Sequence, residues 1–343
     1  MKKTQYYEIL RVIAMFLVIF NHTQGYHLFL GGGEYVGLNL FFSIITRIDV
    51  PIFFMISGAL LLSKEESIKD LYKKRILKIV IVLIVASVAI YLKNNFNYGY
   101  SIKEFIESFF SGEICTSYWY LYSYLATLIM MPFLRKIALS IDNNMFIYLV
   151  VLRFAIVTVF PIISYLFAGL DVSLILQPDF NILISTERSI FFMLIGFYVD
   201  KKMSAEQERK TIKITGFISL VAIPVIEALT IYDGEKNGYS QNFLVLFDFA
   251  MVMFAFVLVK YICTVKLGNN RIVNLIAKVG KLSFGIYLME PFFRTIINEY
   301  IMVIISGNVP ILIESFLYCM VAVIIVGCIT FLVKKVPIIS KLI

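Results

Sequence analysis

The chain has 343 residues, of which 60% are hydrophobic and 16% are charged, and its mean hydropathy is +0.87. Soluble domains are roughly half apolar and about a quarter charged, so this composition excludes an ordinary soluble protein and predicts an integral membrane protein. The net charge of +8 comes from Lys and Arg in short loops between apolar runs, where such residues set topology, and no nucleic-acid-binding pattern accompanies them.

Apolar segments long enough to cross a bilayer recur along the whole length. In lipid they must be helices, because backbone polar groups need partners within their own segment. The expected fold class is all-α, a single polytopic membrane domain over residues 1–343 with about ten transmembrane helices. A short interfacial helix is predicted over 101–111. The predicted spans are 6–30, 36–62, 71–93, 117–139, 144–168, 183–200, 211–232, 240–262, 282–305 and 309–335.

The basic residues predict the orientation of these helices. Of the 31 Lys and Arg residues, five fall within or at the ends of spans and three lie in one set of loops, which leaves 23 on the opposite flanks. Since cytoplasmic loops carry the excess of basic residues, both termini are predicted to be cytoplasmic. Frequent Lys, Ile, Asn, Tyr and Phe suggest an AT-rich bacterial genome, so we expect a multi-pass protein of the bacterial cytoplasmic membrane.

The first predicted span carries Arg11 and His22, with ten residues between them. Eleven helical steps are close to three turns, which puts both side chains on one face about 16 Å apart along the axis. Polar and titratable side chains inside a span are costly and normally line a polar cavity. A neutral imidazole can accept a proton near pH 7. His22 is therefore a candidate general base, and a buried structural histidine is the alternative.

Two carboxylates, Asp49 and Glu290, are predicted to lie near the middle of the membrane. Either would orient the His22 ring as the third member of a catalytic triad does. Glu290 and Arg294 are four residues apart on one helix, so an ion pair between them is the simpler alternative.

The second predicted span contains features that shape its helix. Pro51 is expected to break the helix, because it leaves the carbonyl oxygen of Arg47 unpaired. Gly58, preceded by Ser57, is expected to let another helix approach closely. Both features are expected to shape the wall of a cavity, and ordinary helix packing is the equal alternative. The four cysteines lack metal-type spacing and are expected to be small core or lipid-facing residues, and neither a metal site nor a disulfide framework is predicted.

Five motifs occur in order over nearly the whole chain. They are Arg11 and His22 with ten residues between them, DVPIFFMISGALLL at 49–62, KKRILK at 73–78, WYL at 119–121 through Pro132 and Arg135, and SFGIYLMEP at 283–291. Together they resemble the membrane acyltransferase 3 family. The family usually has His where this chain has Glu290, and often His where it has Ser117.

The resemblance implies a membrane acyltransferase. Such enzymes take an acyl group, often acetyl, from coenzyme A in the cytoplasm and deliver it to a hydroxyl or amine of a sugar, a lipid-linked glycan or cell-wall material. Acetyl-CoA or another acyl-CoA would be the co-substrate, membrane lipids would surround the protein, and membrane helices also leave room for a homodimer. The candidate catalytic residues are His22, Glu290 and Asp49.

The candidate donor-binding residues are basic. Arg11 would grip a phosphate or a pantetheine carbonyl through its planar fork, with a snorkelling interfacial arginine as the alternative. The other candidates would bind the phosphates of coenzyme A, and positive-inside topology explains their presence almost equally well. They are Lys73, Lys74, Arg75 and Lys78.

Candidate acceptor-binding residues lie toward the predicted outer surface. They are Glu187, Arg188 and Trp119, for which mutual ion pairing and an aromatic belt are the simpler explanations.

Transport is the rival function. A related module is joined to serine or alanine racemase domains in some vancomycin-resistance proteins, where amino-acid uptake has been suggested, and the changes at Glu290 and Ser117 fit such a module. Export of a lipid-linked sugar is a third alternative, against which the lack of an internal repeat weighs.

Overall fold

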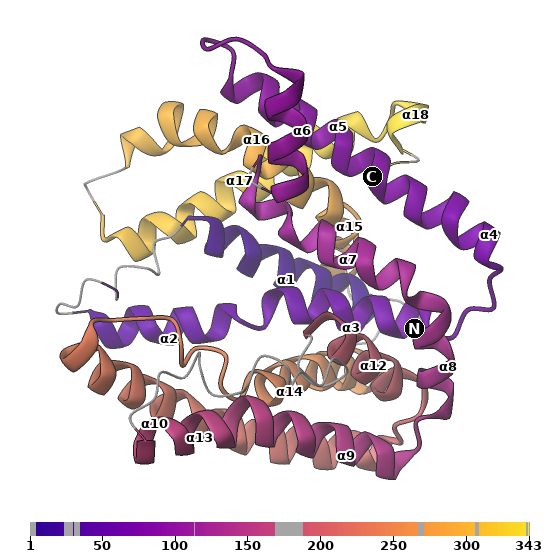
Figure 1. Ribbon diagram of the computed structural model, residues 1–343, viewed down its shortest axis with the longest axis vertical. Coiled ribbons are helices and arrows are strands. Elements are labelled where there is room, and N and C mark those ends of the chain that lie inside the picture. The colour runs from indigo at the N-terminus through magenta and orange to yellow at the C-terminus, as the bar shows by residue number, and fades with distance from the viewer. Residues whose placement is uncertain are drawn as a thin grey trace.

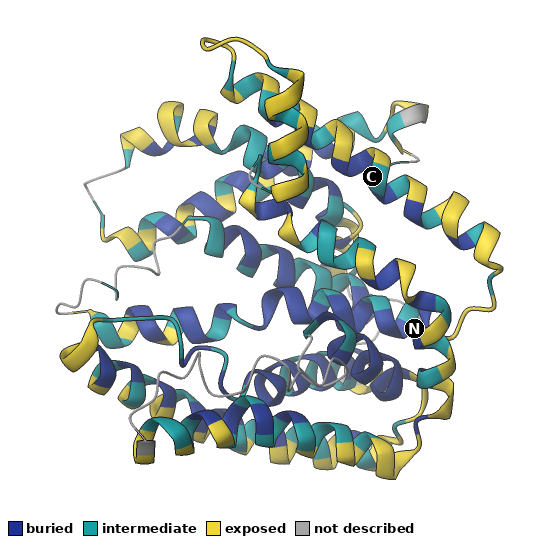
Figure 2. Cartoon of the chain, viewed as in Figure 1, coloured by how far each residue is buried: buried dark blue, intermediate teal, exposed yellow. Residues whose placement is uncertain are grey.

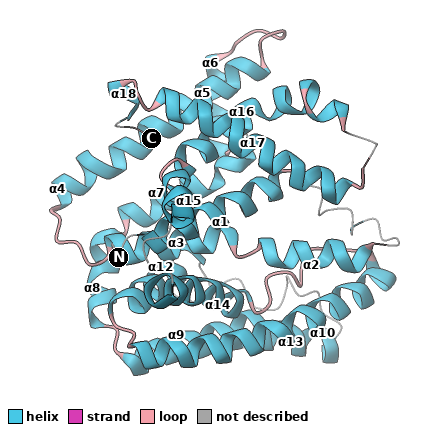
Figure 3. Cartoon of the chain, turned by 180° about the vertical axis from the view of Figure 1, so that it is seen from behind, coloured by secondary structure: helices cyan, strands magenta, loops and turns pink. Residues whose placement is uncertain are grey.

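The structure, a computed structural model, describes residues 5–23, 30, 35–112, 114–168, 188–266, 271–305, 309–340 and 342. Every regular element in this described part is helical (Figure 1, Figure 3), which confirms the predicted all-α fold class. The helices are α1 (Gln5–His22), α2 (Val36–Thr46), α3 (Asp49–Leu61), α4 (Ile68–Leu71), α5 (Leu77–Asn94), α6 (Ile102–Ser111), α7 (Trp119–Ile129), α8 (Met131–Ser140), α9 (Asn143–Phe154), α10 (Phe160–Ala168), α12 (Arg188–Lys201), α13 (Ala205–Asn237), α14 (Asp248–Tyr261), α15 (Arg271–Gly280), α16 (Ser283–Tyr300), α17 (Ile311–Val333) and α18 (Pro337–Ser340).

Helix α1 runs through the centre of the bundle, where it packs against α2, α3, α14, α15, α16 and α17. Leu10, Ala14 and Val18 recur every four residues and are buried, as expected for a helix that turns a continuous apolar stripe toward its neighbours. Figure 2 shows this central region mostly buried, whereas the peripheral helices carry long exposed stripes. Surrounding helices therefore shield α1, and its polar side chains can face cavities instead of lipid.

Within the described ranges, six helices are long and apolar enough to cross a membrane. Each overlaps a predicted span, so the structure supports the membrane assignment. The helix predicted to begin at 240 begins instead at Asp248, after a turn in which Phe247 has a φ of 61°. The six are Val36–Leu61, Ile68–Asn94, Asn143–Phe167, Ala205–Asn237, Asp248–Val265 and Ile311–Val333.

The other four predicted spans contain α1, α7 with α8, α12, and α16. These helices are shorter, interrupted or more highly charged: α7 and α8 are separated at Met130, and α16 carries Glu290, Arg294 and Glu299. Ten crossing helices with both termini in the cytoplasm therefore stay a prediction.

The predicted break in the second span is confirmed, but the carbonyl oxygen of Arg47 is not left unpaired, because it accepts from Arg188 Nη2 at 3.2 Å. Helix α2 ends at Thr46 and α3 begins at Asp49. Between them the amides of Arg47 and Ile48 donate to carbonyls only three residues back, at 3.2 and 3.3 Å. Pro51 lies in the first turn of α3. Backbone amides in a first turn have no partner within the helix, so the N–H that proline lacks costs no hydrogen bond there.

The predicted close approach at Gly58 is also confirmed, and the neighbour is α12. A Cβ atom on Gly58 would lie 1.8 Å from the carbonyl oxygen of Met193, and one on Gly196 would lie 2.1 Å from that of Met55. Two glycines therefore let the backbones of α3 and α12 touch, a packing mode common between membrane helices.

The predicted short helix over 101–111 is present as α6. The Ser101 side chain accepts from the amide of Glu104 at its start, and Gly112 ends it with a φ of 79°. Its interfacial location stays a prediction.

Candidate functional site

Helix α1 ends at His22, and the His22 side chain lines a cavity of about 680 Å³ between α1, α16 and α17. We call this space the His22 cavity. Its lining is His22, Thr23, Arg294, Asn298, Glu299, Met302, Val303, Val309, Ile311, Glu314, Ser315 and Tyr318.

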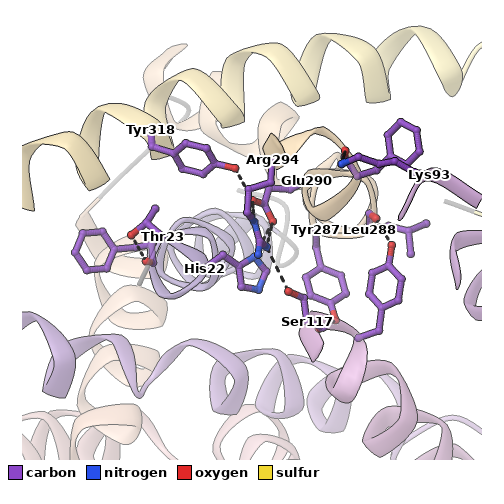
Figure 4. Close-up of polar contacts among 12 residues, drawn as sticks. His22, Thr23, Lys93, Ser117, Tyr287, Leu288, Glu290, Arg294 and Tyr318 are labelled. Carbon is purple, nitrogen blue, oxygen red and sulfur yellow. Dashed lines mark hydrogen bonds and ion pairs between the residues drawn. The ribbon is translucent and has the colours of Figure 1, made fainter. Parts of the chain in front are cut away.

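Glu290, on α16, is the partner of the His22 ring (Figure 4). Its Oε2 lies 2.7 Å from His22 Nδ1 and accepts from Arg294 Nη2 at 2.8 Å. Its Oε1 accepts from Arg294 Nε at 3.0 Å and from the Tyr318 hydroxyl at 2.6 Å. The carboxylate is completely buried, and these four contacts supply the partners that a buried charge requires.

This arrangement fixes the tautomer of the ring. An ionised carboxylate is only an acceptor, so Nδ1 of a neutral His22 carries the hydrogen that points at Glu290. Nε2 is then the unprotonated nitrogen, which can accept a proton from another molecule. The His22 side chain is 13% exposed, so the ring is held in place but is not sealed off.

The two departures from the family pattern, Ser117 and Glu290, meet at one guanidinium. Arg294 Nη2 contacts Ser117 Oγ at 3.3 Å as well as Glu290. The hydroxyl of Tyr287 donates to the backbone carbonyl of Ser117, and that of Tyr118 donates to the carbonyl of Leu288 at 2.8 Å. The start of α7 is thus fastened to α16 directly beside the histidine (Figure 4).

Asp49, the other carboxylate that the sequence offers to His22, lies beside Asn21 instead. Its Oδ2 accepts from the side-chain amide of Asn21, and its Oδ1 accepts from the backbone amide of Val50. Of the two candidates, Glu290 is therefore the carboxylate that the structure brings to the ring.

A second cavity, of about 490 Å³, lies toward the N-terminal half of α1. We call it the basic cavity. Its interior side includes Val18, Ser57, Tyr120 and Tyr287. Six cations line it: Arg11, Lys74, Arg75, Lys78, Lys281 and Lys334.

Four of the five predicted donor-binding residues line the basic cavity, and Lys73 does not. Lys73 and its neighbours form a π-helical turn over Tyr72–Ile76 between α4 and α5, a local widening that is frequent at functional sites. Lys281 and Lys334 were not among the predicted residues. The amine of Lys334 donates to the Lys281 carbonyl at 2.8 Å, and burial together with the charges of Lys78 and Arg11 lowers the pKa of Lys334.

Glu66 holds one wall of the basic cavity in place. Its Oε2 accepts from Arg75 Nε at 2.8 Å and from Arg135 Nη2 at 3.0 Å. Burial alone would raise the pKa of Glu66, but the hydrogen bonds from the two arginines outweigh it and keep that pKa below its usual value. Arg75 is thereby positioned by a carboxylate, whereas Arg11 pairs with Glu8 at 2.6 Å.

The two cavities share none of their described lining residues. Tyr287 lines the basic cavity and bonds to Ser117, and Ser117 in turn contacts Arg294 in the His22 cavity. Ser117 therefore links a residue of one cavity to a residue of the other, through its backbone carbonyl to Tyr287 and through its hydroxyl to Arg294.

Of the three predicted acceptor residues, Glu187 lies outside the described residues, and neither Arg188 nor Trp119 lines the His22 cavity. Arg188 pairs with Asp248 at 3.2 Å and donates to the Arg47 carbonyl at 3.2 Å, and Asp248 is not one of the carboxylates that the sequence singles out. Trp119 is 53% exposed at the start of α7.

Comparison with known proteins gives one result that covers this whole arrangement. The Acyltransferase domain model of the acyltransferase 3 family matches residues 4–332, nearly the entire chain. Comparison with curated proteins and with solved structures gives no match. On this match the chain belongs to the acyltransferase 3 family, and with its apolar helices it is a membrane protein of acyltransferase type.

Proposed function

We propose that this protein takes an acetyl or similar acyl group from acyl-CoA on the cytoplasmic side of the bacterial plasma membrane. The acceptor of this group is a glycan, a lipid-linked sugar or cell-wall material that approaches His22 from the outer side of the membrane. The observation that carries the proposal is the pair of cavities along α1, one lined by six cations and the other by a histidine held by a carboxylate.

The basic cavity suits the donor. Coenzyme A carries several phosphate charges, and Arg and Lys are the side chains that bind phosphate oxygens best. Arg11 and Arg75 would contact the phosphates, with Lys74, Lys78 and Lys334 adding positive potential. Positive-inside topology supports the same side, because loops rich in Lys and Arg face the cytoplasm.

The His22 cavity suits proton transfer. In the proposed reaction, Nε2 of His22 removes a proton from the acceptor as it attacks the thioester carbon. The new bond forms as the carbon–sulfur bond breaks, and the proton passes to the departing thiolate. Glu290 holds Nδ1 and stabilises the imidazolium that forms, the role of the third member of a triad.

Transfer requires the thioester to reach His22 from the basic cavity. Tyr287 and Ser117 lie in its way. We propose that the Tyr287 side chain moves aside when the donor is bound, which breaks a hydrogen bond worth about 1 kcal/mol together with its ring contacts to Tyr118 and Tyr120.

The test uses purified protein reconstituted in vesicles with labelled acetyl-CoA and a library of membrane glycolipids. The proposal predicts label on an acceptor and coenzyme A release only when acetyl-CoA is supplied on the side of the basic cavity. Uptake of L-serine into the same vesicles without acyl-CoA, and no labelled product, would favour the transport alternative and overturn the proposal.

A further inference from the structure

We infer that the acceptor is a primary amine that enters the His22 cavity as an ammonium ion. The inference rests on the proposed function and narrows its acceptor from a hydroxyl or amine to an amine. It depends on which charges in the His22 cavity already have partners.

The positive charge in the His22 cavity is already neutralised. Arg294 gives Nε and Nη2 to the two oxygens of Glu290, at 3.0 and 2.8 Å. This bidentate geometry is the most stable form of such a pair. Since Glu290 is completely buried, its charge does not face the cavity, and the pair as a whole is neutral.

Two carboxylates of the same cavity have no such partner. The side chains of Glu299 on α16, which is exposed, and Glu314 on α17, which is half-buried, make no hydrogen bond or ion pair with any residue that the structure describes. Lys93 acts on Glu299 only through space, because its amine donates to the Phe292 carbonyl at 2.7 Å and to the Thr295 hydroxyl at 3.0 Å.

The two carboxylates line the same cavity as His22 and lie on the two helices that orient its ring. Glu314 precedes Tyr318 by four residues, so both lie on one face of α17, and Tyr318 bonds to Glu290. Glu299 follows Arg294 on α16, beyond Asn298, which also lines the cavity. Beyond the neutral pair of Arg294 and Glu290, the charged residues in the described lining of the His22 cavity are these two carboxylates, and a negative lining favours cations over phosphates.

Four of the other residues that line the cavity are apolar: Met302, Val303, Val309 and Ile311. A molecule with an ammonium group and a neutral carbon skeleton, such as an amino sugar on a lipid, matches both parts of this surface.

The charge also explains how product would leave. The ammonium loses two protons: one passes through His22 to water, and the other ends on the coenzyme A thiol. A carbon–nitrogen bond forms and the carbon–sulfur bond breaks, which leaves a neutral amide. The amide no longer attracts Glu299 and Glu314, so the cavity binds the amine more tightly than its acylated product.

The experiment measures binding and transfer separately. Matched pairs serve as probes, glucosamine against glucose and octylamine against octanol, with N-acetylglucosamine as the product-like amide and glucose 6-phosphate as the anion. Binding is measured by calorimetry and by thermal shift in detergent at low salt. The variants are Glu299→Gln with Glu314→Gln, and Glu104→Gln on α6 as an exposed control outside the cavity.

We expect at least one amine to bind more tightly than its hydroxyl partner, and the double variant to weaken that binding about tenfold. Glu104→Gln should leave it unchanged. The inference is overturned if no amine is preferred, or if the double variant keeps the preference. Amine binding without acetyl transfer would refute the proposed function alone, whereas transfer at equal rates to amines and hydroxyls would refute the inference alone.

Discussion

His22 Nδ1 lies 2.7 Å from Glu290 Oε2, although 268 positions separate the two residues in the sequence. Arg294 and Tyr318 hold the same carboxylate from two further directions. The ring at the end of α1 is therefore oriented by α16 and α17, and a change in either helix should alter its chemistry without touching the histidine.

Replacing Glu290 by glutamine tests this relationship most directly. The amide no longer stabilises a protonated ring and leaves Arg294 without its counter-charge, so we expect acyl transfer to fall about 100-fold or more. The equilibrium constant for acyl-CoA binding, measured by calorimetry, should change little.

A double variant separates catalysis from folding. Glu290→Gln with Arg294→Gln removes both charges and should regain most of the thermal stability that the single variant loses, because an unpaired buried charge is the main source of that loss. Transfer should stay low. Recovery of transfer in the double variant would mean that the Glu290 charge has no part in the reaction.

Tyr318→Phe should have a milder effect. It removes one of the four contacts of Glu290 while keeping the ring volume, which costs about 1 kcal/mol of stability and lowers the turnover number about fivefold to tenfold. Tyr300→Phe, at an exposed position of α16, is the control for loss of a phenol. Equal turnover numbers for the two variants would show that the Tyr318 hydroxyl does not contribute to the reaction.

Gly58→Ala should destabilise the fold strongly. The new methyl group would lie 1.8 Å from the backbone of Met193, so α3 and α12 would have to separate. Overpacking of this kind costs about 1–3 kcal/mol, and we expect a lower melting temperature in detergent. Gly37→Ala adds a methyl group where nothing lies within 4 Å and should melt like the parent protein.

Glu66 predicts a dependence of stability on pH. Its pKa in the fold is lower than its ordinary value of 4.5, so the stability it provides is fully present above pH 4.5 and is lost as the pH falls through the lower folded pKa. Melting temperatures between pH 6 and pH 3 should fall less steeply for Glu66→Gln than for the parent. Glu65→Gln, at the exposed neighbouring position, should follow the parent.

The sequence predicts much of this fold because hydropathy and helix periodicity are local properties. It also predicts the break before Pro51 and the close contact at Gly58, since both follow from the chemistry of one residue. The choice between Asp49 and Glu290 as the partner of His22 depends on how three helices pack, and equal predicted depth cannot decide it.

Other site residues carry no distinctive local signal. Tyr318 is one of 21 tyrosines, and only its position opposite Glu290 sets it apart. Lys281 and Lys334 read as topology signals along with the other basic residues that flank the helices. Lys73 and Lys74 are adjacent on one helical turn and point in different directions, and only the packing of that turn decides which of them lines the cavity.

The central claim is that the two parts of α1 have separate tasks, and one comparison tests it directly. Acetyl-CoA binding and acetyl transfer are measured side by side for His22→Ala and Arg11→Ala. We predict that His22→Ala binds acetyl-CoA like the parent and transfers at most about 1% as fast, whereas Arg11→Ala binds acetyl-CoA about tenfold more weakly. Undiminished transfer by His22→Ala, or unchanged donor binding by Arg11→Ala, would contradict the claim.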